Sequence, residues 1–508
     1  MRNSFTRTKS IEQSMADTDD PDTRLRRDLS AWDLTVFGVA VVIGAGIFTL
    51  TARTAGNVAG PSVSIAFVVA AVTCGLAALC YAEFASTVPV AGSAYTFSYA
   101  TFGEFVAWII GWDLILELAL ASSVVAKGWS LYLGKVLGSD GAAVVRVGSI
   151  DVDWGAVVLI AVLTTLLALG TKLSSRVSLV ITAIKVGVVL LVIVVGLFYI
   201  SPKNYHPFVP PATTGSHGEG IHQTVFSWMT GATGSSFGWY GLLAAASLVF
   251  FAFIGFDVIA TTAEETKNPA RDMPRGILGS LAIVTVLYVG VSIVLSGMVP
   301  YTDLADKRGP NNELVQSTLS TAFKAHGVTW AEWVINLGAL AGLTTVVMVL
   351  LLGQTRIGFA MARDGLFPPS LAKTGTRGTP VRMTIIVGVV AALLAAFFDM
   401  FALEQMVNIG TLFAFVLVCI GVIILRKTRP DLPRGFRVPL VPFTPIIAVI
   451  ACGWLMLNLS LETWLRFVIW MAVGLVVYVA YGRKHSVLAR RERGELPAWN
   501  DKQSDTIA

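Results

Sequence analysis

The sequence predicts an all-α membrane protein with about twelve transmembrane helices, and three observations support this fold class. The 508-residue chain is 55% hydrophobic and only 14% charged, whereas soluble domains carry about 25% charged residues. Apolar stretches of about 20 residues, the length needed to cross a bilayer, recur along the whole chain. Two of these stretches are interrupted by glycine near their centres. A soluble protein is therefore excluded.

The expected spans follow one another at short intervals, and those near residues 391 and 451 are the shortest. Their centres lie near residues 43, 74, 117, 162, 187, 253, 286, 345, 391, 414, 451 and 473. Most of the 37 Lys and Arg residues fall in the two tails and in alternate connections. This positive-inside bias predicts that both termini are cytoplasmic. It also accounts for the net charge of +5 without a nucleic-acid partner.

The order of the spans suggests two related halves. Residues 1–28 and 484–508 are polar cytoplasmic tails, and residues 29–483 form one transmembrane domain. A Gly/Ser/Thr/Pro-rich external segment at 201–238 separates the fifth span from the sixth. We therefore expect one repeat at about 32–200, a second at about 239–426, and two further helices at about 444–483. Because each repeat has five spans, the second would be inverted relative to the first, and spans one and six would be equivalent.

Spans one and six are the two that glycine interrupts. The first break has the sequence VIGAGIF at 42–48, and the second has FAFIGFD at 251–257. Lipid cannot satisfy the backbone groups that such breaks release, so protein or a ligand must do so. Paired, glycine-interrupted spans in corresponding positions of two halves are typical of a transporter's binding site.

The backbone chemistry of the breaks suits a zwitterion. A half-helix that starts at Ala45 and Gly46 presents free N–H groups and a positive dipole end, which favour a carboxylate. A half-helix that ends near Ile254 leaves carbonyls that accept hydrogen bonds from an ammonium group. We therefore expect an α-amino acid as the substrate, and the binding residues are Ile43, Gly44, Ala45, Gly46, Phe251, Ala252, Phe253, Ile254 and Gly255. The plainer alternative is that Gly44-Ala45-Gly46 is a small-residue site of helix packing.

Five charged residues lie within the expected spans. Lys185, in span five, should face the bundle interior, where it either couples its charge to transport or tethers the first broken helix to span eight. On span three, Asp113 and Glu117 share one helix face; Glu117 is the deeper proton-carrier candidate, and Asp113 is expected to cap or pair. Asp257 follows the second break, where it caps the half-helix or joins a proton network. Lys127 has no evident partner.

The sequence shows no pattern of metal ligands. The four cysteines (Cys74, Cys80, Cys419 and Cys452) all fall within expected spans and are interpreted as packing residues. The histidines lie in connections or in a tail. A membrane enzyme with a histidine-containing site is therefore excluded, and no metal or cofactor is expected. An ion channel is disfavoured because the chain shows no filter-like repeats.

Several motifs together resemble the amino acid–polyamine–organocation transporters, in particular the bacterial branch that is similar to cationic amino acid transporters. The resemblance covers residues of about 28 to 482. The motifs are IGAGIF at 43–48, YAEF at 81–84 with Pro89, Gly92 and Tyr95, FAFIGFD at 251–257, AEETKNPARDMPRG at 263–276, and QTR at 354–356 with MARDGLFP at 361–368.

The resemblance implies a LeuT-type 5+5 inverted repeat with twelve transmembrane helices, of which helices 1 and 6 are discontinuous. It implies alternating access and proton-coupled amino acid uptake across the cell membrane, with Lys185, Glu117 and Asp257 as candidates for proton coupling. Lys185 would face span eight near Thr344 and Thr345. The resemblance also implies a cytoplasmic gate, and its candidate residues are Glu83, Arg271 and Arg275. The plainer interpretation of the arginines is an ordinary positive-inside loop.

The side chain of the substrate is harder to predict. Apart from Asp113, Glu117 and Asp257, no carboxylate lies in the spans that face the expected site, and the span-eight stretch LTTVVM at 343–348 is largely apolar. We therefore expect small or medium neutral amino acids alongside or instead of arginine and lysine. Exchange of an amino acid for an amine and a transporter-like amino acid sensor are the alternatives to proton symport. The oligomeric state is not predicted.

Overall fold

The structure is a computed structural model that describes Arg7 and residues 28–88, 93–139, 141–147, 150–170, 175–214, 220–231, 235–308, 314–375 and 379–495. Most of the expected N-terminal tail, the end of the C-terminal tail from residue 496, and the motif residues Pro89 and Gly92 lie outside the described residues.

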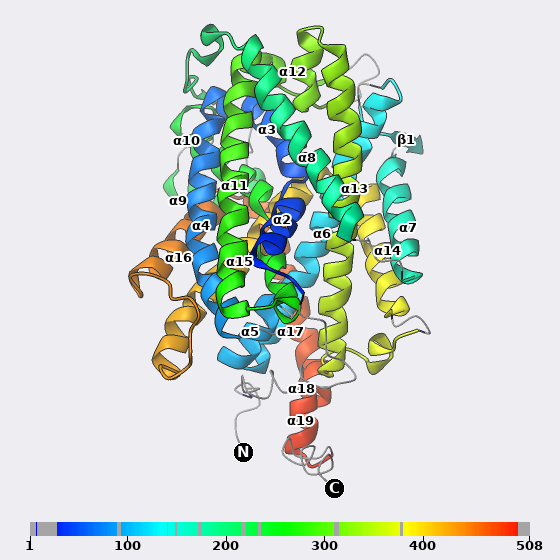
Figure 1. The fold of residues 1–508 in the computed structure, drawn as a ribbon, viewed down its shortest axis with the longest axis vertical. Helices are drawn as coiled ribbons and strands as arrows, with labels where there is room; N and C mark the ends of the chain where they lie inside the picture. Colours follow the sequence, from blue (N-terminus) through cyan, green and yellow to red (C-terminus); the bar gives the residue numbers. More distant parts are fainter. Residues whose placement is uncertain are drawn as a thin grey trace.

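The described chain is a bundle of helices that run side by side along its long axis (Figure 1). Eight helical stretches are long and apolar enough to cross a membrane, at residues 46–87, 104–136, 179–199, 238–263, 269–298, 329–363, 400–428 and 461–485. Four shorter apolar helices accompany them: α2 (Ala31–Val42), α7 (Trp154–Ala168), α14 (Val381–Phe397) and α16 (Phe443–Leu457). Every expected span centre lies in or directly beside one of these helical stretches. The count of twelve crossings and the inverted 5+5 arrangement stay predictions.

The long helices that surround the first break come from distant parts of the chain. They are α4 (Val63–Thr87), α6 (Glu104–Val136), α8 (Ser175–Gly196), α11 (Pro269–Met298), α13 (Thr329–Arg363) and α15 (Met400–Thr428). The broken helices are α2, which continues into α3 (Thr51–Thr54), and α10 (Gly238–Val249), while α17 (Leu461–Val477) packs on α15 and α6.

Local sequence explains where several helices begin. Ser30 and Asp33 form a capping box at the start of α2. Asp399 precedes α15 and accepts hydrogen bonds from the N–H groups of Phe401 and Ala402. Pro269 occupies the first turn of α11, where its missing N–H costs nothing.

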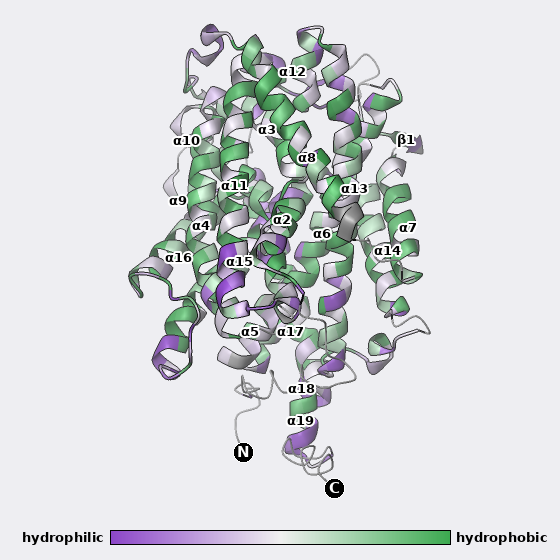
Figure 2. Ribbon diagram, in the orientation of Figure 1, coloured by the Kyte–Doolittle hydropathy of each residue, from purple (hydrophilic) through white to green (hydrophobic). Residues whose placement is uncertain are grey.

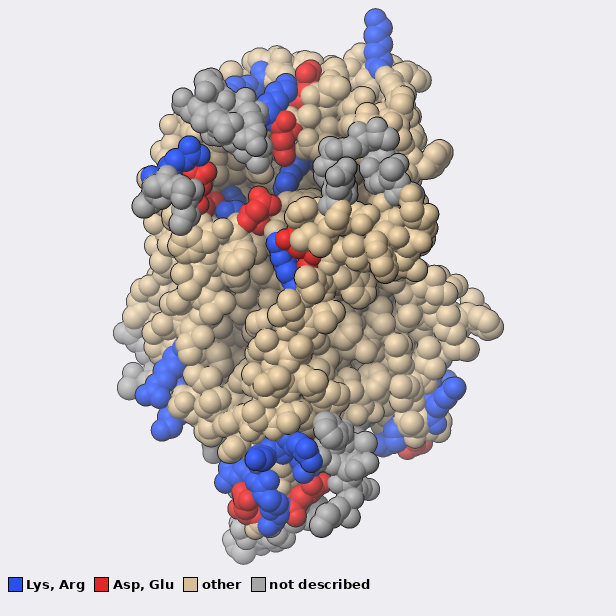
Figure 3. Space-filling model, turned by 180° about the vertical axis from the view of Figure 1, so that it is seen from behind, with Lys and Arg blue, Asp and Glu red and all other residues tan. Residues whose placement is uncertain are grey.

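A belt of apolar residues surrounds the middle of the bundle. Figure 2 shows green, hydrophobic residues along the central part of most helices and purple residues mainly toward the two ends. The space-filling view shows charged side chains at both ends and in the upper half of this face, with a band of mostly uncharged side chains below them (Figure 3). Val286 on α11 is 72% exposed in this belt. Such a surface suits the hydrocarbon core of a membrane.

The connections contain elements that the sequence analysis did not predict. The helix α5 (Ser93–Thr101) lies between α4 and α6, while α9 (Val225–Thr230) and α12 (Leu319–Ala325) lie in later connections. The strands β1 (Val144–Val147) and β2 (Ile150–Asp153) form an antiparallel hairpin before α7. Two shorter pairs are β3 (Thr213–Thr214) with β4 (Ser235–Ser236) and β5 (Lys307–Arg308) with β6 (Leu314–Val315).

The expected C-terminal tail is partly folded. After α17, a π-helical turn leads into α18 (Arg483–His485) and α19 (Val487–Glu492), which pack against the bundle. The N–H of Val487 donates to the carbonyl of Asp364 at 2.9 Å. Arg7 forms an ion pair with Glu492 at 2.7 Å. The two ends of the described chain therefore meet at the same end of the molecule, and the ordered structure extends beyond the expected boundary at residue 483.

Candidate functional site

The first predicted break is present in the structure. Helix α2 ends at Val42, and Ile43 adopts an extended conformation with φ −69° and ψ 91°. The chain becomes helical again at Ala45 and forms a π-helical turn over Gly46–Leu50 before α3. The interruption thus covers Ile43 and Gly44, as the glycine pattern predicted.

The second break is also present. Helix α10 tightens into a 3₁₀ turn over Phe250–Phe253, the chain turns at residues 254–256, and a second 3₁₀ segment follows over Asp257–Glu265. Gly255 has φ +116°, a conformation that residues with a side chain rarely adopt. A Cβ there would also lie 2.9 Å from Cγ1 of Val41 on α2. A glycine is therefore required at this turn.

The two breaks are in direct contact. A Cβ placed on Gly46 would lie 2.3 Å from the Cα of Ala252 and 2.5 Å from its Cβ. The absence of a side chain at residue 46 thus lets the two backbones touch. Gly44 is less crowded, since its Cβ would meet Val346 of α13 at 3.4 Å, an ordinary contact. The expected binding residues of both breaks are therefore brought together at one place in the bundle.

A buried tyrosine hydroxyl binds the backbone of the first break. The hydroxyl of Tyr288, on α11, donates to the carbonyl of Val42 at 2.7 Å. Tyr288 thus occupies a carbonyl of the break, and the predicted carboxylate ligands stay the amides of Gly44, Ala45 and Gly46. Sequence reasoning missed Tyr288, and a buried tyrosine hydroxyl in an apolar helix is the signal that could have marked it.

Lys185 is fully buried and binds the first broken helix. Its ammonium donates to the carbonyl of Ala40 at 2.7 Å. A Cβ on Gly342 of α13 would lie 2.9 Å from the Cγ of Lys185, so the lysine stem packs against that helix. The hydroxyls of Thr344 and Thr345 bind carbonyls of their own helix. The geometry matches the expected link between the first broken helix and span eight, but the contact is made through Gly342.

Glu117 and Asp257 lie in a second group of buried residues. The side chains of both residues are buried, and the charge of Asp257 acts on Glu117. Asp257 is the first residue of the 3₁₀ segment that follows the second break, and its expected capping role stays a prediction. The structure therefore brings these two predicted coupling residues together, while Lys185 contacts α2 and α13.

Asp113 does not behave as expected. The sequence favoured a capping or pairing role for this residue. Its side chain is completely buried, and neither carboxyl oxygen has a hydrogen-bond partner among the described residues. A Cβ on Gly410 of α15 would lie 2.9 Å from its Oδ1. Asp113 is therefore packed against α15 one turn from Glu117, with no cation beside it in the described part of the chain.

Glu83, one of the three predicted gate residues, is paired with arginines from the end of α15 and the connection that follows it. Its carboxylate accepts two hydrogen bonds from Arg426 at 2.9 and 2.6 Å and one from the N–H of Val438 at 2.7 Å. Arg434 lies 3.3 Å away. The other two predicted gate residues, Arg271 and Arg275, are exposed on the first turns of α11. The structure therefore connects Glu83 to the α15–α16 connection.

Lys127, which the sequence left without a partner, has two. Its ammonium donates to the carbonyl of Ala395 on α14 at 3.0 Å and lies 3.5 Å from Asp153, the residue before α7. Burial raises the pKa of Asp153, against the effect of the lysine charge. The pair of Lys127 and Asp153 links α6, α7 and α14, and we interpret it as a structural contact.

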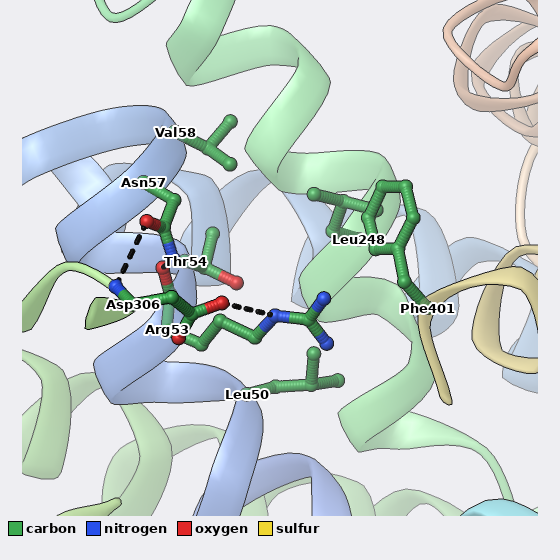
Figure 4. Close-up of a pocket in the computed structure, with 8 residues that line it drawn as sticks. All are labelled: Leu50, Arg53, Thr54, Asn57, Val58, Leu248, Asp306 and Phe401. Atoms are coloured by element: carbon green, nitrogen blue, oxygen red, sulfur yellow. Dashed lines mark hydrogen bonds and ion pairs between the residues drawn. The ribbon is translucent and has the colours of Figure 1, made fainter. Parts of the chain in front are cut away.

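A cavity of about 250 Å³ lies along the half of the first broken helix that follows the break. Figure 4 shows Arg53 and Asp306 paired at its wall and the guanidinium directed toward Phe401. The Arg53–Asp306 distance is 3.3 Å, and the guanidinium carbon lies 5.2 Å from the centre of the Phe401 ring. Asn57, Leu248 and other residues complete the wall. The cavity therefore has a charged pair and an aromatic ring in its wall.

The described residues contain no cluster of three or more His, Cys, Asp or Glu residues that could hold a metal ion. The four cysteines are buried and free. The geometry that stands out is therefore a backbone site between two broken helices, bordered by a buried lysine and by a group of buried carboxyls.

Comparisons with known proteins agree with this architecture. A family model described as amino acid permease matches residues 29–480. The branched-chain amino acid permease BcaP of Bacillus subtilis is 44% identical and is aligned over 96% of this chain and all of that protein. A methylthioribose transporter of the same organism is 42% identical, over 91% of this chain and 95% of that protein. The vacuolar cationic amino acid transporter 4 of Arabidopsis thaliana is 31% identical over 96% of both chains.

These matches span nearly the whole transmembrane domain and include the residues of both breaks. The chain therefore belongs to the amino acid permease family of the amino acid–polyamine–organocation superfamily, and it is a multi-pass membrane protein that transports amino acids and is not an enzyme.

Proposed function

We propose that this protein imports an α-amino acid across the cell membrane by alternating access and that proton symport drives the import. The contact of the two breaks at Gly46 and Ala252 carries the proposal. Two helices that both lose their regular hydrogen bonds at one point offer N–H groups and carbonyls to a single ligand. In this proposal both chain termini are cytoplasmic.

The substrate binds through the groups that all α-amino acids share. Its carboxylate receives hydrogen bonds from the amides of Gly44, Ala45 and Gly46, where a half-helix begins and its dipole favours an anion. Its ammonium donates to the carbonyl of Ile43 in the first break and to carbonyls near the end of the other half-helix, at Phe251, Ala252 and Ile254.

The side chain of the substrate is neutral. Val346 of α13 faces Gly44, and Phe251, Phe253 and Ile254 are buried apolar residues of the second break. An apolar lining favours an aliphatic side chain over a guanidinium or an ammonium. It offers no hydrogen bonds that would compensate for the water that a charged group loses on burial. The name of the Bacillus relative, a branched-chain amino acid permease, agrees with this preference.

Two sets of groups supply the coupling to protons. Lys185 binds the carbonyl of Ala40, two residues before the end of α2, so a change in its charge acts directly on the first broken helix. Glu117 shares its buried surroundings with Asp257, which follows the second break. Ionisable residues buried at membrane depth commonly serve as proton carriers.

The first experiment measures uptake by the purified protein in proteoliposomes with and without an inward proton gradient. The panel contains leucine, valine, alanine, arginine, lysine and methylthioribose. We expect gradient-driven uptake of the neutral amino acids. Uptake of arginine alone would overturn the assigned side chain, and uptake of methylthioribose without any amino acid would overturn the proposed substrate class. Counterflow without gradient-driven accumulation would instead indicate an exchanger, and binding without flux would indicate a sensor.

The second experiment tests the coupling residues. We expect Lys185→Met and Glu117→Gln each to abolish gradient-driven accumulation while counterflow of the substrate persists. Lys127→Met is the control, because it removes a lysine whose pair with Asp153 is interpreted as a structural contact. If Lys185→Met and Glu117→Gln accumulated substrate with the pH dependence of the wild type, neither residue would couple protons to transport.

A further inference from the structure

The first break can be described by the hydrogen bonds that it lacks. In a continuous α-helix the N–H of residue i donates to the carbonyl of residue i−4, so Gly44 would bind Ala40 and Gly46 would bind Val42. Here the ammonium of Lys185 donates to the carbonyl of Ala40 instead. The hydroxyl of Tyr288 donates to the carbonyl of Val42. Two side chains from outside the helix have therefore replaced its own bonds.

Tyr288 also contacts the second break. Its ring centre lies 5.3 Å from that of Phe253, the last residue before the turn at 254–256. Phe67 of α4 packs against both rings, at 5.9 Å from Tyr288 and 6.2 Å from Phe253. Tyr288 is completely buried. One side chain of α11 thus binds the first break through its hydroxyl and packs on the second break through its ring.

We infer that Tyr288 is a positioning residue for the substrate. Its hydroxyl keeps the first break open, so that the amides of Ala45 and Gly46 remain directed toward the ligand, and its ring holds the second break in register with the first. The inference rests on the proposed function, because the residues that it positions are the proposed binding groups. A hydroxyl that satisfies a released carbonyl of an interrupted helix lowers the cost of presenting bare backbone to a ligand.

A purely structural role is the alternative, and the chain contains a matched control for it. Tyr132 of α6 is completely buried as well. Its hydroxyl donates to the carbonyl of Phe48 at 2.7 Å, the same distance as in the Tyr288 bond. It binds the same broken helix beyond the break and not within it. Replacement of either tyrosine by phenylalanine removes one hydroxyl and leaves the ring.

The test compares Tyr288→Phe with Tyr132→Phe in transport assays of the full chain with the amino acid that the wild type imports best. We expect Tyr288→Phe to raise KM about tenfold, the size of effect typical for loss of a buried hydrogen bond, with a smaller change in kcat. Tyr132→Phe should change KM less than twofold although it lowers the Tm by a similar amount. An unchanged KM in Tyr288→Phe, or equal increases in the two variants, would overturn the inference.

Hydrogen exchange at the peptide that contains residues 40–48 provides a readout that does not depend on transport. This peptide should exchange faster in Tyr288→Phe than in the wild type, because the carbonyl of Val42 loses its partner at the break, and it should change less in Tyr132→Phe. Equal exchange in all three proteins would contradict the assigned hydrogen bond. If the wild type itself transported no amino acid, the proposed function would fail, whereas faster exchange in Tyr288→Phe alone would still confirm the hydrogen bond.

Discussion

Glu83 of α4 and Arg426 of α15 form a two-pronged ion pair across 343 residues of sequence. The glutamate is 2% exposed, and its Oε2 also accepts from the N–H of Val438. Phe436 donates to the hydroxyl of Ser86 in the same region, at 3.2 Å. The α15–α16 connection is therefore held against the end of α4 by a buried charge.

Removal of that charge should destabilise the protein. Glu83→Gln leaves Arg426 and Arg434 without their carboxylate, and truncation of a buried ion pair costs about 3 kcal/mol. We expect a clear fall in the Tm of the detergent-solubilised protein. Asp151→Asn is the control, because it breaks the exposed pair with Arg146 and should leave the Tm unchanged. Equal Tm values for Glu83→Gln and the wild type would show that the ion pair does not stabilise the contact between α4 and the α15–α16 connection.

The crossing of the two breaks should not tolerate a methyl group at residue 46. In Gly46→Ala the new Cβ would overlap the backbone of Ala252, and overpacking of this kind costs about 1–3 kcal/mol. We expect loss of uptake together with a lower Tm. Gly44→Ala is the steric control, since its Cβ has room beside Val346, and its Tm should stay close to that of the wild type. A Gly46→Ala protein with normal Tm and uptake would contradict the observed crossing.

Asp113 should be dispensable for coupling. Because its buried carboxyl has no hydrogen-bond partner among the described residues, Asp113→Asn removes an unpaired acid without breaking a contact. We expect an unchanged or higher Tm and normal gradient-driven accumulation in proteoliposomes. If Asp113→Asn abolished accumulation while Glu117→Gln retained it, the proton-carrier role would move from Glu117 to Asp113.

Asp306, which lies in the wall of the cavity, should make the stability of the protein depend on pH. Burial raises the pKa of Asp306 above its usual value of 3.8, although the Arg53 guanidinium opposes the shift. Between 3.8 and the raised pKa the folded protein holds a proton that the unfolded chain has lost, so the contribution of Asp306 to stability falls as pH rises through this window.

Asp306→Asn should remove this contribution. We expect its Tm to vary less with pH, at pH values above 3.8, than the Tm of the wild type. Thermal unfolding at several pH values checks this. Identical pH profiles for the two proteins would show that Asp306 does not titrate in this range.

The helices and both breaks were predictable because they depend on local sequence. Apolar runs of about 20 residues report burial in lipid, and glycine marks the places where the backbone departs from the helix. At Gly255 the positive φ is a local requirement that the residue type reveals.

The partners of the buried side chains were not predictable. The sequence could place Lys185 inside the bundle but not against the carbonyl of Ala40, 145 residues earlier. It favoured a capping or pairing role for Asp113 that the described residues do not provide, and it gave no sign that Arg426 binds Glu83. The contacts of Tyr288 were not predictable, because a tyrosine in an apolar helix carries no local sign of what its hydroxyl binds.

The sequence by itself therefore determined that the chain is a helical membrane protein with two interrupted helices, since hydropathy and glycine act within a few residues. Only the tertiary structure decided that Gly46 touches Ala252 and that Tyr288 and Lys185 take over the hydrogen bonds of the first break. The physical reason is that a released backbone group has no preferred partner in sequence. Its partner is whichever side chain the packing of distant helices brings within hydrogen-bond distance.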